Sequence, residues 1–347
     1  MLELRIGTRG SQLALAQTRI IAEKILCSYP DARIEIVAIK TQGDKNMTPF
    51  SSDVNGIKGM FTFEIEQALL SGEIDFAVHS LKDLPANTKF PVVAYSQRGN
   101  PFDALVLRME SVLQSDDFTR HTLHSRNFMQ NISRPKNFTQ EASCSQDFSR
   151  LPLHSRDFTQ DISHAEDFTC SAKNFVIGSS SLRRRLQLER LYPDAKIIPV
   201  RGNINTRLAK LDDGEFSGLV LASAGLERLG LENRITKIFT PDEIMPAPGQ
   251  GILACQGRPD EDYYYLEAVN DECSRDCAIA ERSFARELGA GCNVPIGAYA
   301  EILDDERMRL RGLFIDERTR KFYRGEIEGR RDEAETLGKK LAEVIMS

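Results

Sequence analysis

The segment FVIGSSSLRRRLQLERL, residues 175–191, joins a short apolar run to a stretch in which apolar side chains recur at helical spacing. A strand that runs directly into a helix accounts for both halves. The same change from strand to helix recurs in KIIPVRGNINTRLAKL (196–211) and in GLVLASAGLERL (218–229). Strands and helices that alternate at these lengths predict parallel βαβ units and therefore an α/β fold.

The segments before this region predict further elements of the same kind. Strands are expected at 2–7, 33–41, 74–80, 91–96 and 104–108, and helices at 11–26 and 60–70. The chain changes character at residue 273, where a helix (273–288) precedes three strands at 296–303, 308–316 and 319–327. A closing helix follows, whose apolar positions are Leu337, Leu341, Val344 and Ile345. This order predicts a separate small α+β domain.

Composition limits the class of protein. The 347 residues suffice for two or three domains, each with its own core. The net charge of −6 argues against nucleic-acid binding, and no run of 18 apolar residues predicts a membrane span. The seven cysteines show no disulfide framework and the N-terminus lacks a signal-peptide layout, so reduced thiols in a cytoplasm are expected. Only one histidine, His79, lies outside one unusual segment, so no metal site is predicted.

That unusual segment, at about 111–172, repeats an Asp-Phe or Asn-Phe pair every ten residues. LHSRNFMQNIS and LHSRDFTQDIS recur in it thirty residues apart, and the repeated unit is polar with few aliphatic side chains. We predict a tandem insertion that is largely disordered. A small repeat domain and a partner-binding arm are the alternatives.

Basic and hydroxyl side chains gather where predicted strands end and helices begin. Ligands of open α/β sheets bind beyond the carboxyl ends of strands, where helix N-termini also offer free N–H groups. Arginine adds a fork that binds carboxylate or phosphate at two points. Any one of these arginines could be a solvated surface charge, but so many at one topological position predict an anion-binding cleft. The residues are Arg9, Ser179, Ser180, Ser181, Arg183, Arg184, Arg185, Arg201, Arg207 and Arg228.

HSLKDLP (79–85) ends another predicted strand and brings Lys82 and Asp83 to the same cleft. The two side chains could form only an exposed ion pair, which contributes little to stability. Alternatively, Asp83 is the one acid among many cations, and these cations keep its carboxylate ionised. An ionised carboxylate there can accept a hydrogen bond from an N–H donor or stabilise a developing cation. The long polar segment 41–61 could be a mobile lid or an ordinary surface loop.

Cys292 lies between Gly291 and Asn293 in ELGAGCNVPIG (287–297). A buried structural cysteine is the ordinary interpretation. A glycine-flanked loop after a helix would instead leave the sulfur accessible. Without a neighbouring base such a thiol would be a poor nucleophile for repeated turnover, but it could form one durable covalent bond.

Seven motifs, in this order, resemble those of the porphobilinogen deaminase (hydroxymethylbilane synthase) family. They are TRGSQLALAQ (8–17), HSLKDLP (79–85), GSSSLRRR (178–185), RGNINTRL (201–208), AGLERLG (224–230), PAPGQGILA (246–254) and GAGCNVPIGAYA (289–300). The resemblance spans the chain except the repeat. It implies two α/β domains like the halves of a periplasmic binding protein and a small α+β C-terminal domain. The domain limits implied are 1–98 with 249–270, 104–244 including the insertion, and 273–347.

The family joins four porphobilinogen molecules head to tail onto a dipyrromethane primer, with loss of ammonia each time. Hydrolysis then releases hydroxymethylbilane for tetrapyrrole and heme biosynthesis. The resemblance implies that Cys292 holds the dipyrromethane cofactor by a thioether. It also implies that Asp83 faces the pyrrole N–H groups and the cation formed as ammonia leaves. Porphobilinogen is the implied substrate, and its acetate and propionate groups suit the predicted cationic cleft.

The motifs also imply which residues contact those acetates and propionates. The side chains are Arg9, Ser11, Lys82, Ser181, Arg183, Arg184, Arg201, Arg207 and Arg228, with backbone groups at Ser179 and Ser180. Lys58 and Phe61 match a segment near the lid. Three features depart from the family pattern: Ser179 stands where threonine is usual, Arg185 is an additional cation, and the repeat is foreign.

The expected protein is thus a cytoplasmic monomer that binds neither nucleic acid nor membrane. A two-lobed binding protein for anionic solutes, without catalysis, is the alternative. Cys292 and Asp83 distinguish the two, because simple binding needs neither.

Overall fold

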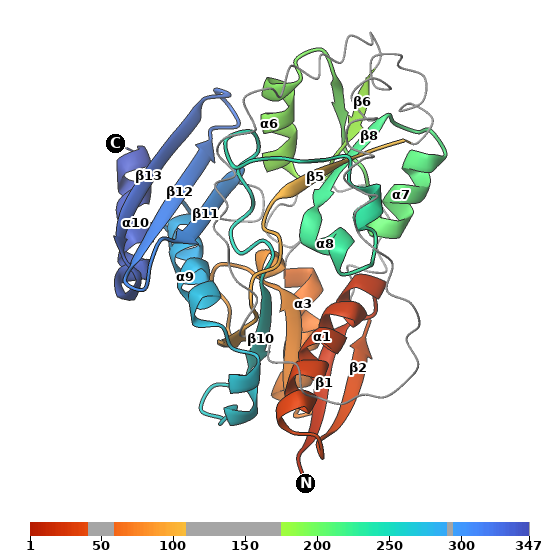
Figure 1. The fold of residues 1–347 in the computed structure, drawn as a ribbon, viewed down its shortest axis with the longest axis vertical. Helices are drawn as coiled ribbons and strands as arrows, with labels where there is room; N and C mark the ends of the chain where they lie inside the picture. Colours follow the sequence, from red (N-terminus) through yellow and green to blue (C-terminus); the bar gives the residue numbers. More distant parts are fainter. Residues whose placement is uncertain (41–58, 109–174, 290–293, 347) are drawn as a thin grey trace, which may run out of the picture.

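The computed structural model describes residues 1–40, 59–108, 175–289 and 294–346. Most of the predicted lid (41–58), the repeat and Cys292 lie outside these ranges. Within them the chain forms three β-sheets, each with helices and a hydrophobic core of its own. The two larger sheets form lobes at the bottom and top of Figure 1, and the third sheet lies beside them.

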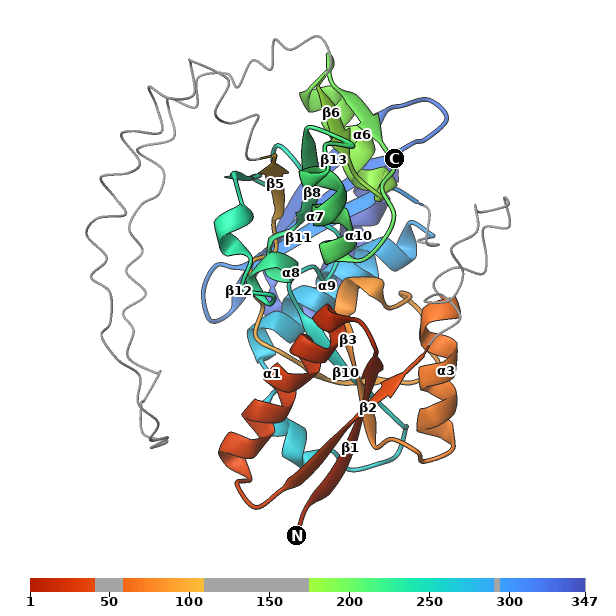
Figure 2. The ribbon, with the colours of Figure 1, turned by 90° about the vertical axis from the view of Figure 1, so that its right-hand side faces the viewer.

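The first lobe is built on a sheet of order β2-β1-β3-β10-β4. Its strands are β1 (Glu3–Arg9), β2 (Arg33–Ile39), β3 (Phe76–Ser80), β4 (Val92–Tyr95) and β10 (Leu253–Gly257). Helices α1 (Gln12–Ser28) and α3 (Gly59–Leu70) cover opposite faces of the sheet (Figure 2). Strand alternation explains this, because Phe76 and Val78 pack in the core beside α1 and Ala77 packs in the core beside α3.

The second lobe repeats this plan with the order β7-β6-β8-β5-β9. Its strands are β5 (Asp103–Leu107), β6 (Val176–Gly178), β7 (Lys196–Ile198), β8 (Gly218–Ala222) and β9 (Lys237–Ile238). Its helices are α6 (Leu182–Leu191), α7 (Ile204–Asp212) and α8 (Ser223–Glu227). Ser181 and Asn203 cap α6 and α7, so each of these helices begins where the strand-to-helix pattern predicts.

The third unit is an antiparallel sheet of β11 (Ile296–Ile302), β12 (Arg307–Ile315) and β13 (Phe322–Arg330). Helices α9 (Glu272–Glu287) and α10 (Ala334–Met346) pack in its core. Of the four apolar positions singled out in α10, Val344 is 63 % exposed and the other three are buried. Short 3₁₀ helices complete the described chain: η1 (Leu81–Asp83), η3 (Glu232–Arg234), η4 (Tyr264–Ala268) and η5 (Arg331–Glu333).

The predicted fold class is confirmed: two α/β lobes and a small α+β domain. The predicted parallel βαβ units are present, since β1 pairs parallel with β2 and β3, and β6 pairs parallel with β7 and β8; one strand in each of these two sheets runs the other way. β10 runs antiparallel to β3 and β4, and β5 runs antiparallel to β8 and β9. Each of these strands follows a segment that crosses from one lobe to the other, so it enters its sheet against the direction of the βαβ units. The domain limits given above stay a prediction.

The two crossing segments lie side by side. The amide of Gly99 donates to the carbonyl of Gly251 (3.0 Å). Gly251 has a φ of +92°, and a Cβ there would lie 2.5 Å from the Gly99 carbonyl oxygen, so this contact requires glycine.

The third unit joins this crossing through Glu281, which is fully buried. The Glu281 carboxylate accepts hydrogen bonds from Arg98 Nη1 (2.7 Å) and from the amides of Gly249 (2.6 Å) and Ala300 (2.7 Å). All three units therefore meet at one point.

Candidate active site

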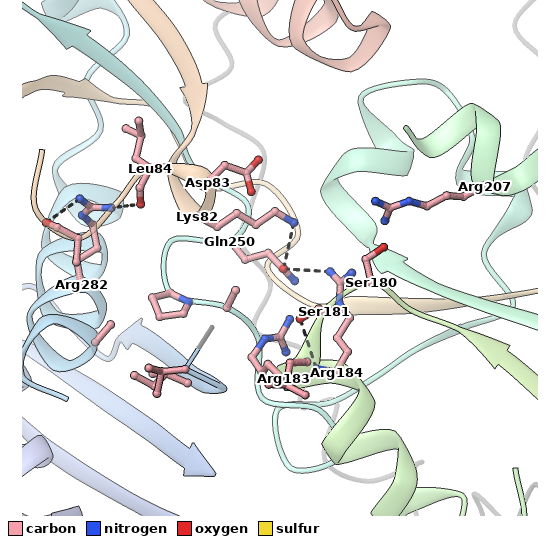
Figure 3. Close-up of a pocket in the computed structure, with 17 residues that line it drawn as sticks. Lys82, Asp83, Leu84, Ser180, Ser181, Arg183, Arg184, Arg207, Gln250 and Arg282 are labelled. Atoms are coloured by element: carbon pink, nitrogen blue, oxygen red, sulfur yellow. Dashed lines mark hydrogen bonds between the residues drawn. The ribbon is translucent and has the colours of Figure 1, made fainter. Parts of the chain in front are cut away.

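A cavity of about 420 Å³ lies where the two lobes and the third unit meet (Figure 3). The first lobe and the crossing segment supply Lys82, Asp83, Leu84, Ala86, Ala247, Pro248 and Gln250. The second lobe supplies Ser180, Ser181, Leu182, Arg183, Arg184 and Arg207, and the third unit supplies Arg282, Ala285, Val294 and Ile296. Five of these lining side chains are cationic and one, Asp83, is acidic, so the cavity suits a ligand that carries several negative charges.

Lys82 and Asp83 lie on η1, the turn that directly follows β3. Leu81 anchors this turn, because its side chain is fully buried and its amide donates to the carbonyl of Ile252 (3.0 Å). Asp83 is left exposed at the cavity. Its carboxylate accepts no hydrogen bond from the part of the chain that the structure describes.

The N-terminus of α6 supplies the serines and two of the arginines. The Ser181 hydroxyl caps the helix by accepting from the Arg184 amide (3.5 Å), and the Ser180 hydroxyl donates to the carbonyl of Val200. Ser179 is buried, and its amide donates to the carbonyl of Ile198 (2.9 Å). That amide therefore faces the neighbouring strand and not the cavity.

Arg183 and Arg184 line the cavity, but both are also bound to a carboxylate of the protein. Asp103, at the start of β5, is fully buried and accepts from Arg183 Nη2 (3.0 Å) and Arg184 Nη2 (2.7 Å). Burial alone would raise the pKa of Asp103, but the two guanidinium groups hold it well below its ordinary value. The two arginines thus lie in fixed positions with part of their charge already neutralised.

Gln250 connects the two lobes at this point. Its Nε2 donates to Asp103 Oδ1 (2.7 Å), and its Oε1 accepts from Lys82 Nζ (3.4 Å) and Arg184 Nη2 (3.4 Å). Burial, together with the nearby charge of Arg184, lowers the pKa of Lys82 to about 8. The Lys82 ammonium is therefore mostly charged at neutral pH but gives up its proton more readily than an ordinary lysine.

The remaining cations predicted at the cleft lie at different depths. Arg207 lines the cavity, and burial lowers its pKa to about 10, so it stays charged at neutral pH. Arg228 donates to the carbonyl of Gly251 at the lobe crossing and does not line the cavity as the described residues form it. Arg9 is half-buried at the end of β1, and Arg201 is exposed before α7.

Two polar residues near the same edge have structural partners. The Ser11 hydroxyl caps α1 by accepting from the Ala14 amide (3.2 Å). His79 is buried in β3, and burial lowers its pKa to about 4. The imidazole is thus neutral at physiological pH and adds no charge to the cavity.

Cys292 and Lys58 lie outside the described residues, and for Phe61 only its place in α3 is described. Val294, two residues after Cys292 in the sequence, does line the cavity, as does Ile296. The segment that carries Cys292 therefore joins the described chain at the edge of the site.

Three polar residues at the site escape prediction from the sequence: Gln250 and Arg282, which line the cavity, and buried Asp103, which is bound to Arg183 and Arg184. Asp103 stands in the apolar run FDALVL, where an acid at the start of a strand is the single available signal. Gln250 falls within the quoted motif PAPGQGILA, and Arg282 lies in the helix at 273–288 among several charges. Their partners are far away in the sequence, so no local pattern reveals them.

The fold and the cavity define a class: a two-lobed α/β protein that binds an anionic ligand between its lobes. Residues 4–125 and 143–265 match the family description "Porphobilinogen deaminase, dipyromethane cofactor binding domain", and residues 276–347 match "Porphobilinogen deaminase, C-terminal domain". The chain belongs to the porphobilinogen deaminase family. Its activity is that of hydroxymethylbilane synthase (EC 2.5.1.61), an enzyme of tetrapyrrole biosynthesis that uses a dipyrromethane cofactor.

Curated relatives match along the whole chain. The porphobilinogen deaminase of Ruminiclostridium josui is 37 % identical, and the match covers 100 % of this chain and 99 % of that protein. The porphobilinogen deaminase of Thermus thermophilus is 38 % identical over 98 % of this chain and 94 % of that protein. The alternative of a binding protein without catalysis does not hold for a member of this enzyme family.

Among solved structures, the BvgS VFT2 domain of Bordetella pertussis (a double mutant) is similar with 12 % identity and a TM-score of 0.35. The match covers 78 % of this chain and 84 % of that one. A likeness of that size says nothing about function.

None of the helices in the described residues has the length and apolar character that crossing a membrane requires. No group of three or more histidine, cysteine, aspartate or glutamate side chains lies close enough to hold a metal ion within the same ranges.

The cavity fits the dipyrromethane cofactor, whose two pyrrole rings carry acetate and propionate groups. Carboxylates are the natural partners of the guanidinium groups that line it. Arg184 Nε is buried and has no hydrogen-bond partner among the described residues, which leaves a donor for a ligand. The Asp83 carboxylate in the cavity wall is a hydrogen-bond acceptor, the kind of group that pairs with an N–H donor.

Proposed function

We propose that Cys292 holds the cofactor by a thioether and that Asp83 is the catalytic residue of the condensation. One observation carries the proposal: Asp83 and cations from both lobes converge on a single cavity that Val294, next to the Cys292 segment, also lines. When bound, the cofactor supplies the primer to which porphobilinogen is added. A cysteine in this place needs no base, because it forms one lasting bond.

The cationic side chains bind the acetate and propionate groups in this proposal. Lys82, Arg183, Arg184 and Arg207 are supported by their places in the cavity wall. The others proposed for the site are Arg9, Ser11, Ser180, Ser181, Arg201 and Arg228, with Lys58 and Phe61 near the lid. The Ser179 amide, already bonded to the carbonyl of Ile198, is not available to a ligand. Those carboxylates carry the same charge before and after reaction, so these residues bind and orient the substrate without changing the barrier by themselves.

Asp83 acts on the charge that does change. Positive charge grows on the pyrrole ring of porphobilinogen as ammonia departs, and a fixed carboxylate stabilises that charge more than it stabilises the neutral ground state. Asp83 can also accept the pyrrole N–H and so orient the ring.

The test compares Asp83→Asn with Asp83→Glu, both carrying a preassembled cofactor. Asparagine keeps an oxygen acceptor and removes the charge, so kcat should fall on the order of 10²-fold or more with little change in the binding of porphobilinogen. Glutamate keeps the charge and shifts it, so its loss should be smaller. Asp213→Asn, which removes an exposed carboxylate at the end of α7, is the matched control. A near-normal kcat for Asp83→Asn would reduce Asp83 to a structural residue.

We also propose that the enzyme is a cytoplasmic monomer that takes porphobilinogen as its substrate. The four cysteines in the described ranges, Cys27, Cys255, Cys273 and Cys277, are free thiols, which supports a reducing compartment. Sedimentation of the holoenzyme measures its mass in solution, and a dimer would contradict the proposal.

A further inference from the structure

Arg282, on α9 of the third unit, binds the loop that follows Asp83. Its Nη1 donates to the carbonyl of Leu84 (3.3 Å; Figure 3). Its Nη2 donates to the carbonyls of Pro85 (2.6 Å) and Ala86 (3.1 Å). Three successive carbonyl groups of the first lobe thus converge on one guanidinium from another part of the chain.

This use of an arginine differs from that of its neighbours on the same helix. Arg275 and Arg286, two turns before and one turn after, form ion pairs with the carboxylates of Asp276 and Glu335. Arg282 is partly buried and donates to neutral carbonyls, and no carboxylate of the described chain is paired with it. Burial lowers its pKa, so holding the charge here has a cost, which the hydrogen bonds to the loop offset.

The loop needs such a partner. Pro85 has no N–H group, and residues 84–86 belong to no helix or sheet. Their carbonyls therefore have no hydrogen-bond partner from regular secondary structure. A guanidinium presents several donors in one rigid plane and can satisfy successive carbonyls at once. Lysine, with one flexible ammonium, cannot reproduce that geometry.

The turn that carries Asp83, held by the buried side chains of Leu81 and Leu84, decides where this residue lies. Its carboxylate accepts no hydrogen bond within the described chain, so no side-chain contact there fixes it. On one side, the turn that carries it is closed by the Leu84 amide, which donates to the carbonyl of Leu81 (3.1 Å). On the other side, the Leu84 side chain is buried in a core cluster with Leu81 and Ala278, and Arg282 binds the carbonyls of residues 84–86.

We propose that Arg282 is a positioning residue, which holds the loop after Asp83 and thereby sets the carboxylate at the distance that turnover requires. The inference rests on the proposed catalytic role of Asp83. It makes the position of Asp83 depend on the third unit, to which Cys292 also belongs. The same unit would then position both the catalytic carboxylate and the cysteine that holds the cofactor.

The experiment measures kcat and KM of Arg282→Met, Arg282→Lys, Asp83→Asn and the double variant Asp83→Asn/Arg282→Met, each with a preassembled cofactor. Misplacing a catalytic group by about 1 Å costs up to about 10²-fold, so kcat of Arg282→Met should fall by roughly 10- to 100-fold with KM nearly unchanged. Arg282→Lys should recover part of this loss. Hydrogen exchange at the amides of residues 82–84 and 86–88 should become faster in Arg282→Met, with or without cofactor. Arg286→Met is the matched control and should behave as the unmodified enzyme.

The double variant separates positioning from direct binding. If Arg282 acts through Asp83, its loss should add little once Asp83 is asparagine; losses that multiply would overturn the inference. An unchanged kcat in Arg282→Met, beside an impaired Asp83→Asn, would overturn the inference alone. A normal kcat in Asp83→Asn would refute the proposed role of Asp83 and, with it, this inference. If Arg282→Met does not fold, Arg282→Lys carries the same comparison.

Discussion

Replacing Asp103 with asparagine should destabilise the second lobe by about 3–5 kcal/mol, the usual cost of removing one partner from a buried ion pair. The Asp103 carboxylate is fully buried and accepts three hydrogen bonds, from Arg183 (3.0 Å), Arg184 (2.7 Å) and Gln250 (2.7 Å). Asparagine keeps one oxygen but turns an N–H₂ group toward a donor. Two buried guanidinium groups then have no counter-ion within the described part of the chain.

A second aspartate in the same lobe provides the control. Asp212 pairs with Arg234 at 2.6 Å, close to the 2.7 Å of Asp103 and Arg184, but its side chain is 49 % exposed. An exposed pair of this kind contributes about 0–1 kcal/mol. Asp212→Asn and Asp103→Asn remove the same charge from pairs of similar length, so the two variants differ mainly in burial.

Thermal unfolding of the two holoenzyme variants measures the difference. For a unit of this size each 1 kcal/mol shifts Tm by roughly 2–4 °C, so Asp103→Asn should lower Tm on the order of 10 °C and Asp212→Asn by less than about 4 °C. Equal Tm shifts would refute the reasoning, because burial would then make no difference to the contribution of the ion pair to stability.

The same contact has a pH signature. Because Arg184 and Arg183 outweigh burial and hold the pKa of Asp103 below its ordinary value, its contribution to stability is present at neutral pH. It is lost as the pH falls below about 4, the ordinary pKa of aspartate, toward the lowered pKa in the folded state. The Tm difference between the unmodified enzyme and Asp103→Asn should therefore shrink on acidification.

Three further predictions concern the anchor, the repeat and Lys82. Cys292→Ser should fold but carry no covalent dipyrromethane and show almost no turnover. Intact mass and an aldehyde colour test for pyrroles measure the adduct, and an adduct that persists would contradict the assignment of Cys292 as the attachment site. Deleting residues 113–172 should leave cofactor assembly and kcat largely intact, and an insoluble product would contradict this. With a pKa of about 8, Lys82 should be acetylated by trace acetic anhydride much faster than exposed Lys196 in cofactor-free protein, and more slowly once cofactor carboxylates favour its charged form. Equal rates for the two lysines would count against the lowered pKa.

Sequence patterns could locate the cavity because strand ends are local features. Lys82 and Asp83 follow an apolar run, and Arg183, Arg184 and Arg207 follow short strands, so the α/β topology alone gathers them. The patterns could not show that Arg183 and Arg184 share a buried counter-ion. That contact exists because β5 pairs antiparallel with β8, which brings Asp103 opposite Ala222, and this pairing depends on the lobe crossing.

The order of the strands in the first sheet has a consequence for synthesis on the ribosome. In the sheet, β10 lies between β3 and β4. In the chain, however, residues 96–252 separate β4 from β10, so they leave the ribosome before β10 does. At translation speeds of roughly 5–20 residues per second, the edges of β3 and β4 stay without their shared partner for about 10–30 s. Unpaired strand edges promote aggregation, so the nascent first lobe should depend on chaperones during this interval. The repeat falls within the same interval and lengthens it.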